Sequence, residues 1–474
     1  MDPLHERELA SPALDKVAKA AAGYLFGLDD RLVADPAATE LLAELRQPLP
    51  EDGLGTLDSV EELLRVGTTA ATHSAGPRFF HFVIGGATPA AMAGDWVAAL
   101  LDQNAGLWTS SQFATTIETV ALGWLKDLFG LPNDWGGVLT PSATFANLTG
   151  LAAARQWWGN MHGRDISADG LAGLPTMPVF SGGYVHASVR KALQILGAGR
   201  DTVTVCSRDD AGRVDLDGLA DELDRLNRPA VIVGCAGEVN AGDFDPIDAM
   251  ADLAEKHGCW LHVDGAFGLF AALSPRTAHL VDGMQRADSV AADAHKWLNV
   301  PYESGFVFVR DPRALTEAFG SWHAPYLASV DDSQIDYNQL GPESSRRARA
   351  LPIWATLRAY GRAGHRAVVE RHLDLTAHLG HLVEDATDLE LLAPVQLCIA
   401  CFRYRPPGFP ADEVDELNSR LGRELLSDGR VYVGTTVYRG HVAMRPAIVN
   451  WRTTERDIEL LVDVVRELGA RISS

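Results

Sequence analysis

The stretch Ser289-Val290-Ala291-Ala292-Asp293-Ala294-His295-Lys296-Trp297 leads from a short apolar run into a lysine flanked by histidine and tryptophan. A second apolar run, Trp260-Leu261-His262-Val263, also ends at a polar side chain, Asp264, which two small residues follow. Runs of this length and composition are typical of buried strands. The two stretches therefore predict strands that each end next to a chemically useful side chain.

The same pattern extends from Phe82 to about Arg310, where short β-rich runs alternate with helical stretches. Helical stretches such as Leu219–Leu226 and Ile247–His257 separate the earlier runs. This alternation predicts an α/β fold with a largely parallel sheet, whose ligands lie at the carboxyl ends of the strands. Besides Trp260–Val263 and Ser289–Ala292, the clearest predicted strands are Val203–Val205, Ala230–Val233 and Gly305–Val309.

The two ends of the chain differ from this central part. Residues 1–80 are predicted to form an N-terminal helical dimerisation segment, with helices at Leu14–Phe26 and Thr39–Leu45. Residues 81–350 form the large domain, including a polar, mobile loop at 321–349, because loops of this length are often lids or binding loops. Residues 351–474 are predicted to form a smaller α+β domain, with strands near Val395–Tyr404, Val431–Val433 and His441–Ala447.

Composition narrows the classes of function. The formal net charge of −22 argues against nucleic-acid or anionic-membrane partners, although it does not exclude a local basic pocket. No run of 18 uninterrupted apolar residues and no signal peptide is visible, so we expect a cytoplasmic protein. We expect no metal site.

Five cysteines in so long a chain do not make a disulfide framework. Cys398-Ile399-Ala400-Cys401 has the spacing of a redox motif, but it lies inside the apolar run Val395–Phe402. A strand there would point the two cysteines to opposite faces. The motif is therefore interpreted as structural.

Lys296 and Asp264 suit one kind of chemistry when taken together. A lysine can condense with an aldehyde once it is a neutral nucleophile, and a carboxylate can hold a proton on a pyridine nitrogen. Pyridoxal 5′-phosphate (PLP) requires both groups. Taken singly, each residue has a plainer interpretation: Lys296 as a lysine extending from a buried strand, and Asp264 as a cap at a strand end.

Two further segments fit the same chemistry. Thr140–Asn147 follows an apolar run and opens a helical stretch, where hydroxyl side chains and free N–H groups suit a phosphate. Ordinary N-capping is the alternative. His186 precedes a predicted helix, where its imidazole could stack on a cofactor ring or serve only the structure.

These motifs, in this order, resemble the group II PLP-dependent amino-acid decarboxylases, the family of the aromatic L-amino-acid, histidine and glutamate decarboxylases. The resemblance runs from Pro77-Arg78-Phe79-Phe80 through His295-Lys296-Trp297 to Tyr360-Gly361-Arg362-Ala363-Gly364. It implies PLP fold type I, which is aspartate-aminotransferase-like. It also implies PLP as the cofactor, an amino acid as the substrate, and a homodimer with shared active sites.

The resemblance also implies roles for single residues. Lys296 would hold the cofactor aldehyde and Asp264 the ring nitrogen, with Ala266 and His186 on the two ring faces. Tyr326 resembles the family's loop tyrosine, which returns a proton to the substrate Cα after CO2 leaves. The implied phosphate contacts are Ser142, Ala143, Thr144 and His295, and the implied substrate contacts are Phe79, Phe80, Asn104 and Trp108.

The sequence departs from the aromatic decarboxylases at three places. Asp293 stands where asparagine is usual, which adds negative charge near a phosphate. Gly237-Glu238-Val239-Asn240 replaces a Gly-Thr-Thr-Ser stretch, and Asn240 is expected to contact the cofactor. Asn104 and Gly106 stand where larger apolar residues would grip an aromatic side chain, which argues against an aromatic substrate.

The predicted activity is decarboxylation of an L-amino acid to its amine and CO2. One alternative is an aldehyde synthase, which couples decarboxylation to oxidative deamination. In this family that outcome accompanies phenylalanine at the loop tyrosine or asparagine at the stacking histidine, so Tyr326 and His186 favour the amine. A PLP carbon–carbon lyase or aldolase on the same scaffold and a non-catalytic PLP-binding protein are the remaining candidate functions.

Several arginines have open roles. Arg445 fits either a place near the site or a structural salt bridge. Arg346, Arg347 and Arg349 are expected by default to form a solvated basic face, and alternatively to anchor the loop or receive an acidic side chain.

Overall fold

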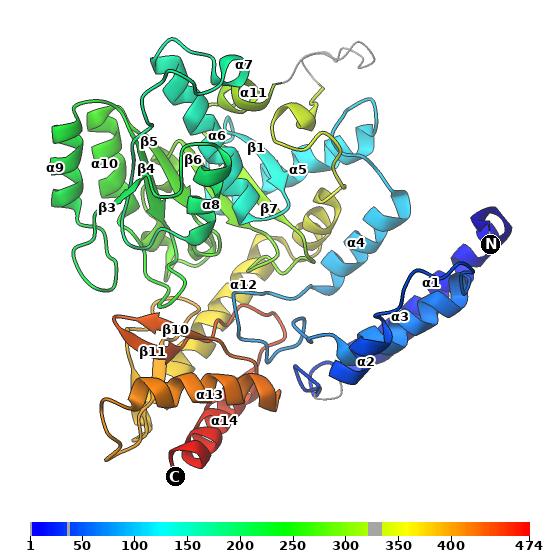
Figure 1. The fold of residues 1–474 in the computed structure, drawn as a ribbon. Helices are drawn as coiled ribbons and strands as arrows, with labels where there is room; N and C mark the ends of the chain where they lie inside the picture. The colour runs from blue at the N-terminus through cyan, green and yellow to red at the C-terminus, as the bar shows by residue number, and fades with distance from the viewer. Residues whose placement is uncertain (1, 36–37, 321–333) are drawn as a thin grey trace.

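The computed structural model describes residues 2–35, 38–320 and 334–474, and its centre is a seven-stranded sheet (Figure 1). Five neighbouring strands are parallel, and β7 runs antiparallel to both of its neighbours, β1 and β6. The predicted α/β fold with a largely parallel sheet is therefore confirmed. In sheet order the strands are β1 Gly136–Thr140, β7 Gly305–Val309, β6 Ser289–Asp293, β5 Trp260–Asp264, β4 Val231–Cys235, β2 Val179–Ser181 and β3 Val203–Val205.

Helices cover this sheet and bury its side chains in one large apolar core. The long helix α6 packs against β5, β6 and β7, while α10 packs against β4 and β5. Five strands, β2, β4, β5, β6 and β7, are fully buried, as expected for a sheet covered by helices. The helices of this part are α6 Ala143–Met161, α7 Ile166–Asp169, α8 Ala187–Ile195, α9 Leu216–Leu226, α10 Ile247–His257 and α11 Arg313–Phe319, with 3-10 helices η2 Gly268–Leu273, η3 Ala278–Val281, η4 Met284–Arg286 and η5 Tyr337–Gln339.

The N-terminal residues are helical, as predicted. Helices α1 and α3 lie side by side, and in both views they stand apart from the central sheet (Figure 1). Two further helices, α4 and α5, then lead into β1. The helices are η1 Pro3–Leu9, α1 Ala10–Gly27, α2 Ala38–Glu44, α3 Thr56–Ala70, α4 Pro89–Leu101 and α5 Gln112–Phe129.

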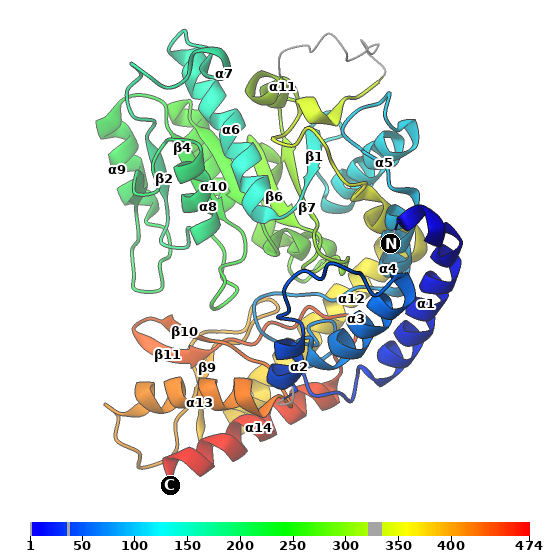
Figure 2. The same cartoon turned by 45° about the vertical axis from the view of Figure 1, so that its right-hand side comes forward.

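The C-terminal residues form a second, antiparallel sheet of order β10-β11-β9-β8 with its own apolar core. Figure 2 shows this sheet and helices α13 and α14 below the central sheet. The long helix α12 is interrupted at Gly361, whose φ of 59° is accessible mainly to glycine. The elements are α12 Ala350–Asp385, β8 Leu389–Leu391, β9 Phe402–Tyr404, α13 Val414–Asp428, β10 Thr435–Tyr438, β11 His441–Met444 and α14 Glu455–Ser473.

The C-terminal strands are shorter or displaced relative to the prediction. The run Val395–Tyr404 becomes a strand only at Phe402–Tyr404, and Val431–Val433 makes a single bridge, through Tyr432 to Phe79. Apolar composition alone does not separate an extended core segment from a strand, because both are buried. The domain boundaries at residues 80 and 350 stay a prediction.

Cys398 and Cys401 lie outside any strand, so the expected strand alternation does not apply to them. Both are buried with free thiols, and burial raises the pKa of each. A high thiol pKa makes a cysteine unreactive, which agrees with the structural interpretation. No helix in the described ranges has the length and apolar character needed to cross a membrane.

The buried carboxyl group of Asp245 has a hydrogen-bond partner on only one of its two oxygens among the described residues. Asp245 is 1% exposed; its Oδ2 accepts a hydrogen bond from Cys235 N, whereas Oδ1 has no hydrogen-bond partner among the described residues. Burial raises the pKa of Asp245 from 3.8 to about 7. At pH values between these two pKa values, Asp245 keeps its proton in the folded state and loses it in the unfolded chain. The free energy of unfolding therefore falls as pH rises through this window.

We predict that Asp245→Asn stabilises the protein, and more so at pH 8 than at pH 5. The asparagine carbonyl can still accept from Cys235 N, but it carries no charge to desolvate. The gain at pH 8 should be about 2–4 kcal/mol, from about 1.4 kcal/mol per unit of pKa shift. Thermal unfolding at the two pH values measures it, with the exposed Asp463→Asn as control. An equal effect of Asp245→Asn at both pH values would contradict the prediction.

Candidate functional site

Lys296 lies in the turn that follows β6, beside the N-terminus of α6. Its Nζ is 3.0 Å from Asp293 Oδ2, and Asp293 Oδ1 accepts a 2.5 Å hydrogen bond from Ala143 N. The lysine side chain is 20% exposed, whereas the aspartate is only 5% exposed. Asp293 thus binds both the amine of Lys296 and the first N–H group of helix α6.

Asp264 ends β5, the parallel neighbour of β6, so Asp264 and Lys296 leave the sheet at the same edge. Both carboxylate oxygens of Asp264 are held. Asn147 Nδ2 donates to Oδ2 at 2.9 Å, and Ala266 N donates to Oδ1 at 3.2 Å. These two hydrogen bonds fix the orientation of the Asp264 side chain.

His186 is the N-cap of α8 and joins the same cluster. Its Nδ1 lies 2.7 Å from Ser188 Oγ, and the same hydroxyl accepts from Asn147 Nδ2 at 3.1 Å. Burial lowers the pKa of His186; Lys296 also lowers it, while Asp264 acts in the opposite direction. The imidazole is therefore neutral near pH 7.

His295 is buried on the other side of Lys296. Its Nδ1 accepts from Ser304 N at 3.2 Å, its Nε2 lies 3.6 Å from Asp293 Oδ2, and its ring stacks on Tyr302 with centroids 4.1 Å apart. Burial lowers the pKa of His295. A neutral imidazole in this position can donate one hydrogen bond to an anion.

The predicted phosphate segment begins helix α6. Ser142 is the N-cap of α6, yet its side chain makes no capping hydrogen bond, so ordinary N-capping does not explain it. A Cβ atom at Gly305 would come within 2.7 Å of the Ser142 backbone, and therefore only glycine lets β7 approach this turn. Ser304 Oγ, next to Gly305, is buried and without a partner among the described residues. Asp293 binds the first N–H group of this helix, whereas the hydroxyl groups of Ser142 and Ser304 beside it are spare in the described part of the chain, which fits a phosphate.

Other predicted site residues have structural partners. Asn240 accepts from Thr436 Oγ1 on β10 at 2.6 Å and donates to Glu238, which ties the central part to the C-terminal sheet. Phe80 packs into the C-terminal core, and Phe79 stacks on Tyr432. Their cofactor and substrate roles stay predictions.

Asn104 and Trp108 lie in the loop between α4 and α5. Asn104 Oδ1 accepts from Gly106 N and from Arg346 N, both at 3.0 Å, while Trp108 N donates to Asp336. A Cβ atom at Gly106 would come within 2.4 Å of Ser344 O. The small residues of this loop therefore have a packing reason, and their bearing on substrate size stays a prediction.

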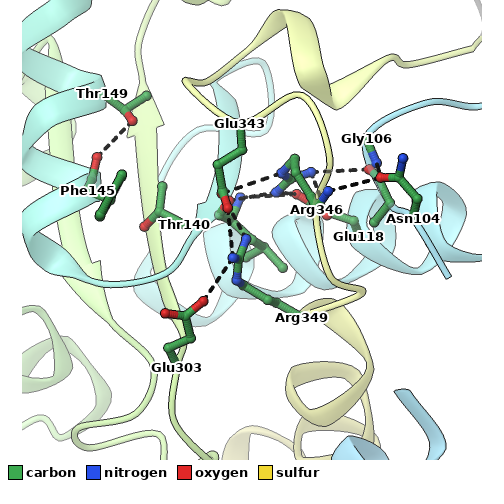
Figure 3. Close-up of polar contacts among 12 residues, drawn as sticks. Asn104, Gly106, Glu118, Thr140, Phe145, Thr149, Glu303, Glu343, Arg346 and Arg349 are labelled. Carbon is green, nitrogen blue, oxygen red and sulfur yellow. Dashed lines mark hydrogen bonds and ion pairs between the residues drawn. The ribbon is translucent and has the colours of Figure 1, made fainter. Parts of the chain in front are cut away.

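Arg346 and Arg349 do not form a solvated basic face, which corrects the default expectation. Arg346 binds Glu118 through both Nη atoms, at 3.2 and 2.8 Å, with both side chains buried (Figure 3). Arg349 binds Glu343 twice and Glu303 once. These ion pairs fix residues 343–349 against the end of β1. Arg347 alone is exposed, and it pairs with Asp95.

Sequence reasoning missed Asn147, Ser188 and Tyr302, which contact Asp264, His186 and His295. Asn147 lay inside the predicted phosphate segment but received no separate role. Arg445 donates to Phe82 O at 2.8 Å and lies near enough to His186 to lower its pKa, which favours a place near the site. Tyr326 lies outside the described residues.

Comparisons with known proteins point to one enzyme family. The model of the "Pyridoxal-dependent decarboxylase conserved domain" matches residues 40–405. An aromatic-L-amino-acid decarboxylase of Bacillus atrophaeus is 28% identical over 98% of this chain and 96% of its own. A phenylacetaldehyde synthase of Arabidopsis thaliana is 27% identical over 94% and 93% of the two chains.

Solved structures are similar along the whole chain. The structure of Oryza sativa TDC with PLP and tryptamine superposes with a TM-score of 0.91 at 25% identity and covers 100% of both chains. That of mouse CSAD gives a TM-score of 0.87 at 25% identity, over 97% of this chain and 99% of the other. Together with the sheet, these likenesses confirm PLP fold type I, and the match over most of its length shows that this chain belongs to the family of pyridoxal-dependent decarboxylases.

Proposed function

We propose that the cluster around Lys296 is the active site, and that it decarboxylates an L-amino acid to the corresponding amine. The observation that carries the proposal is the contact of Asn147 with both Asp264 and Ser188, which links Asp264 to His186 at the edge of the sheet where Lys296 also lies. Aromatic amino acids are the first candidates, because the similar proteins include decarboxylases of aromatic amino acids and because packing explains Asn104 and Gly106.

The residues present fit PLP. Lys296 would hold its aldehyde, Asp264 its ring nitrogen, and the segment Ser142–Thr144 with His295 its phosphate. Bound PLP supplies an electron-accepting ring that makes cleavage at Cα feasible. His186 and Ala266 would lie against the ring, and Asp264 would keep a proton on its nitrogen.

The other steps belong to the chain's own residues. Lys296 would leave the cofactor aldehyde when the substrate amine binds there, and it would later help to release the product. Tyr326 donates the proton that replaces the lost carboxylate at Cα, which gives the amine. Because Tyr326 and His186 are both present, amine is favoured over the aldehyde that a synthase such as the Arabidopsis phenylacetaldehyde synthase would release.

We predict that purified protein with PLP releases CO2 and amine in equal amounts from at least one amino acid of a panel. The panel contains aromatic, acidic and aliphatic L-amino acids, and CO2, amine, aldehyde and peroxide are all measured. Lys296→Ala should lower the rate about 100-fold or more, because it removes the covalent attachment and a proton carrier.

The matched control is Lys191→Ala, which removes an exposed lysine of α8. Aldehyde and peroxide in place of amine would overturn the amine product and favour the synthase. An unchanged rate in Lys296→Ala would overturn the assignment of the site.

We predict that Asp293→Asn binds PLP more tightly than the wild type, with a Kd about 3- to 10-fold lower. In the described structure the Asp293 carboxylate takes up the Ala143 N–H group and the Lys296 amine, the partners that the phosphate and the aldehyde need. Asparagine removes the charge that repels a phosphate. Fluorescence titration of the apoprotein measures Kd, with Asp95→Asn as control. A Kd that rises would show that the carboxylate helps to hold the cofactor.

We also propose a homodimer. Helix α4 exposes Trp96, Val97, Leu100 and Leu101, and Phe113 at the start of α5 is exposed as well. Positions 96, 97, 100 and 101 share one side of α4, and an exposed apolar helix face of this kind marks an interaction site. The cytoplasmic location expected from the sequence stays a prediction.

We predict that Leu100→Glu shifts the protein from dimer to monomer, because Leu100 is 70% exposed and would place a charge in the interface. Sedimentation measures the mass at several concentrations. Ile195→Glu, which changes an exposed apolar residue of α8, serves as control. A monomeric wild type, or a Leu100→Glu variant that stays dimeric, would contradict the prediction.

A further inference from the structure

A chain of hydrogen bonds runs behind Asp264 through Asn147 and three further buried residues, which have no role in the proposed function. Trp260 Nε1 donates to Ser289 Oγ at 3.0 Å, and Ser289 Oγ lies 2.8 Å from His262 Nδ1. His262 Nε2 lies 2.9 Å from Asn147 Oδ1. Asn147 then contacts Asp264. Gly150 makes this approach possible, because a Cβ there would come within 2.9 Å of the His262 ring.

The first half of the chain begins with a fixed donor. An indole N–H only donates, so Ser289 Oγ accepts from Trp260 and keeps its own hydrogen free to donate to His262 Nδ1. His262 is fully buried, and burial lowers its pKa to about 4, so the ring carries a single proton at neutral pH. That proton is on Nε2 and is donated to Asn147 Oδ1.

The hydrogen bonds beyond His262 are donated in the same direction, away from Trp260. With its oxygen facing His262, Asn147 presents its amide hydrogens to Asp264 Oδ2 and to Ser188 Oγ. A flipped amide would set its oxygen against the Asp264 carboxylate, so the two ends of the chain agree. Ser188 then donates to His186 Nδ1, which also accepts from Ser188 N, and the proton of His186 is therefore on Nε2.

We propose that Trp260, Ser289, His262 and Asn147 are positioning residues, which hold the Asp264 side chain in place and His186 as its Nε2–H tautomer. The proposal rests on the proposed function, since it concerns the two residues that would contact the PLP ring. With Asn147 Oδ1 facing His262, an Nδ1–H tautomer of His262 would set Nε2 against that oxygen, so two buried acceptors would face each other without a donor. The chain therefore sets the orientation of the Asn147 amide, and with it the donors that reach Asp264 and Ser188.

The competing interpretation is that these residues only satisfy one another in the core. Both interpretations predict a lower Tm when the chain is broken. The two interpretations make different predictions for the cofactor. Substitution of a positioning residue changes the affinity for PLP and the pH dependence of its absorption, because such a residue acts through Asp264 and His186. Substitution of a purely structural residue changes neither.

The test compares His262→Phe with His262→Gln. Phenylalanine removes the donor to Asn147 Oδ1, whereas glutamine can present an amide N–H group there. We expect His262→Phe to raise the Kd of the apoprotein for PLP about tenfold and to shift the midpoint of the pH titration of the cofactor absorption band. His262→Gln should restore both to within about threefold of the wild type.

Ser289→Ala is a second variant with a smaller change in volume, and it should raise Kd about threefold. Ser181→Ala is the control: Ser181 is equally buried in the same sheet, but donates to Val233 O outside the chain. It should lower Tm and leave Kd and the absorption profile unchanged. His262→Phe and Ser289→Ala variants that bind PLP with the wild-type Kd and pH profile, whatever their Tm, would overturn the proposal.

The two proposals fail in different ways. A wild type that binds PLP but releases no CO2 from any amino acid refutes the proposed function. The PLP affinity and absorption of the variants still decide the role of the chain in that case.

Discussion

The arrangement of the site depends on the buried hydrogen bond between Asn147 and Asp264. It joins the N-terminal part of α6, which begins in the predicted phosphate segment, to the end of β5, where the predicted partner of the ring nitrogen lies. A buried polar group without partners is costly. Asn147 and the Ala266 backbone both donate to Asp264, which is only 5% exposed. The distance between the two ends of a bound cofactor is thus set by the packing of one helix on one sheet.

Charge is concentrated at the opposite end of the site. Asp293, Lys296 and the N-terminus of α6 lie within hydrogen-bond or ion-pair distance of one another. The two partners of Asp293, Ala143 N and Lys296 Nζ, are also the groups that a phosphate and an aldehyde would use. A cofactor would therefore replace the contacts with Asp293 by its own contacts. Its affinity would measure the difference in free energy between the two sets of contacts.

The sequence predicted the central part of the fold well because strand ends there coincide with polar residues. Gly305–Val309 and Ile247–His257 have the predicted bounds, and β5 and β6 each extend one residue further, to Asp264 and Asp293. The C-terminal strands were misplaced because buried extended segments share the composition of strands. Arg346 was misjudged since its partner Glu118 lies 228 residues earlier in the chain, and nothing local marks such a pair.

Asn147 was missed for a different reason. On a helix that is buried on most sides, an asparagine differs from its apolar neighbours only through partners on other elements, here His262, Ser188 and Asp264. Conversely, Asn104 and Gly106 suggested a pocket without apolar walls, and the structure gives both residues packing partners in Arg346 and Ser344. A polar or small residue can serve the backbone or the substrate, and the local sequence shows neither set of partners.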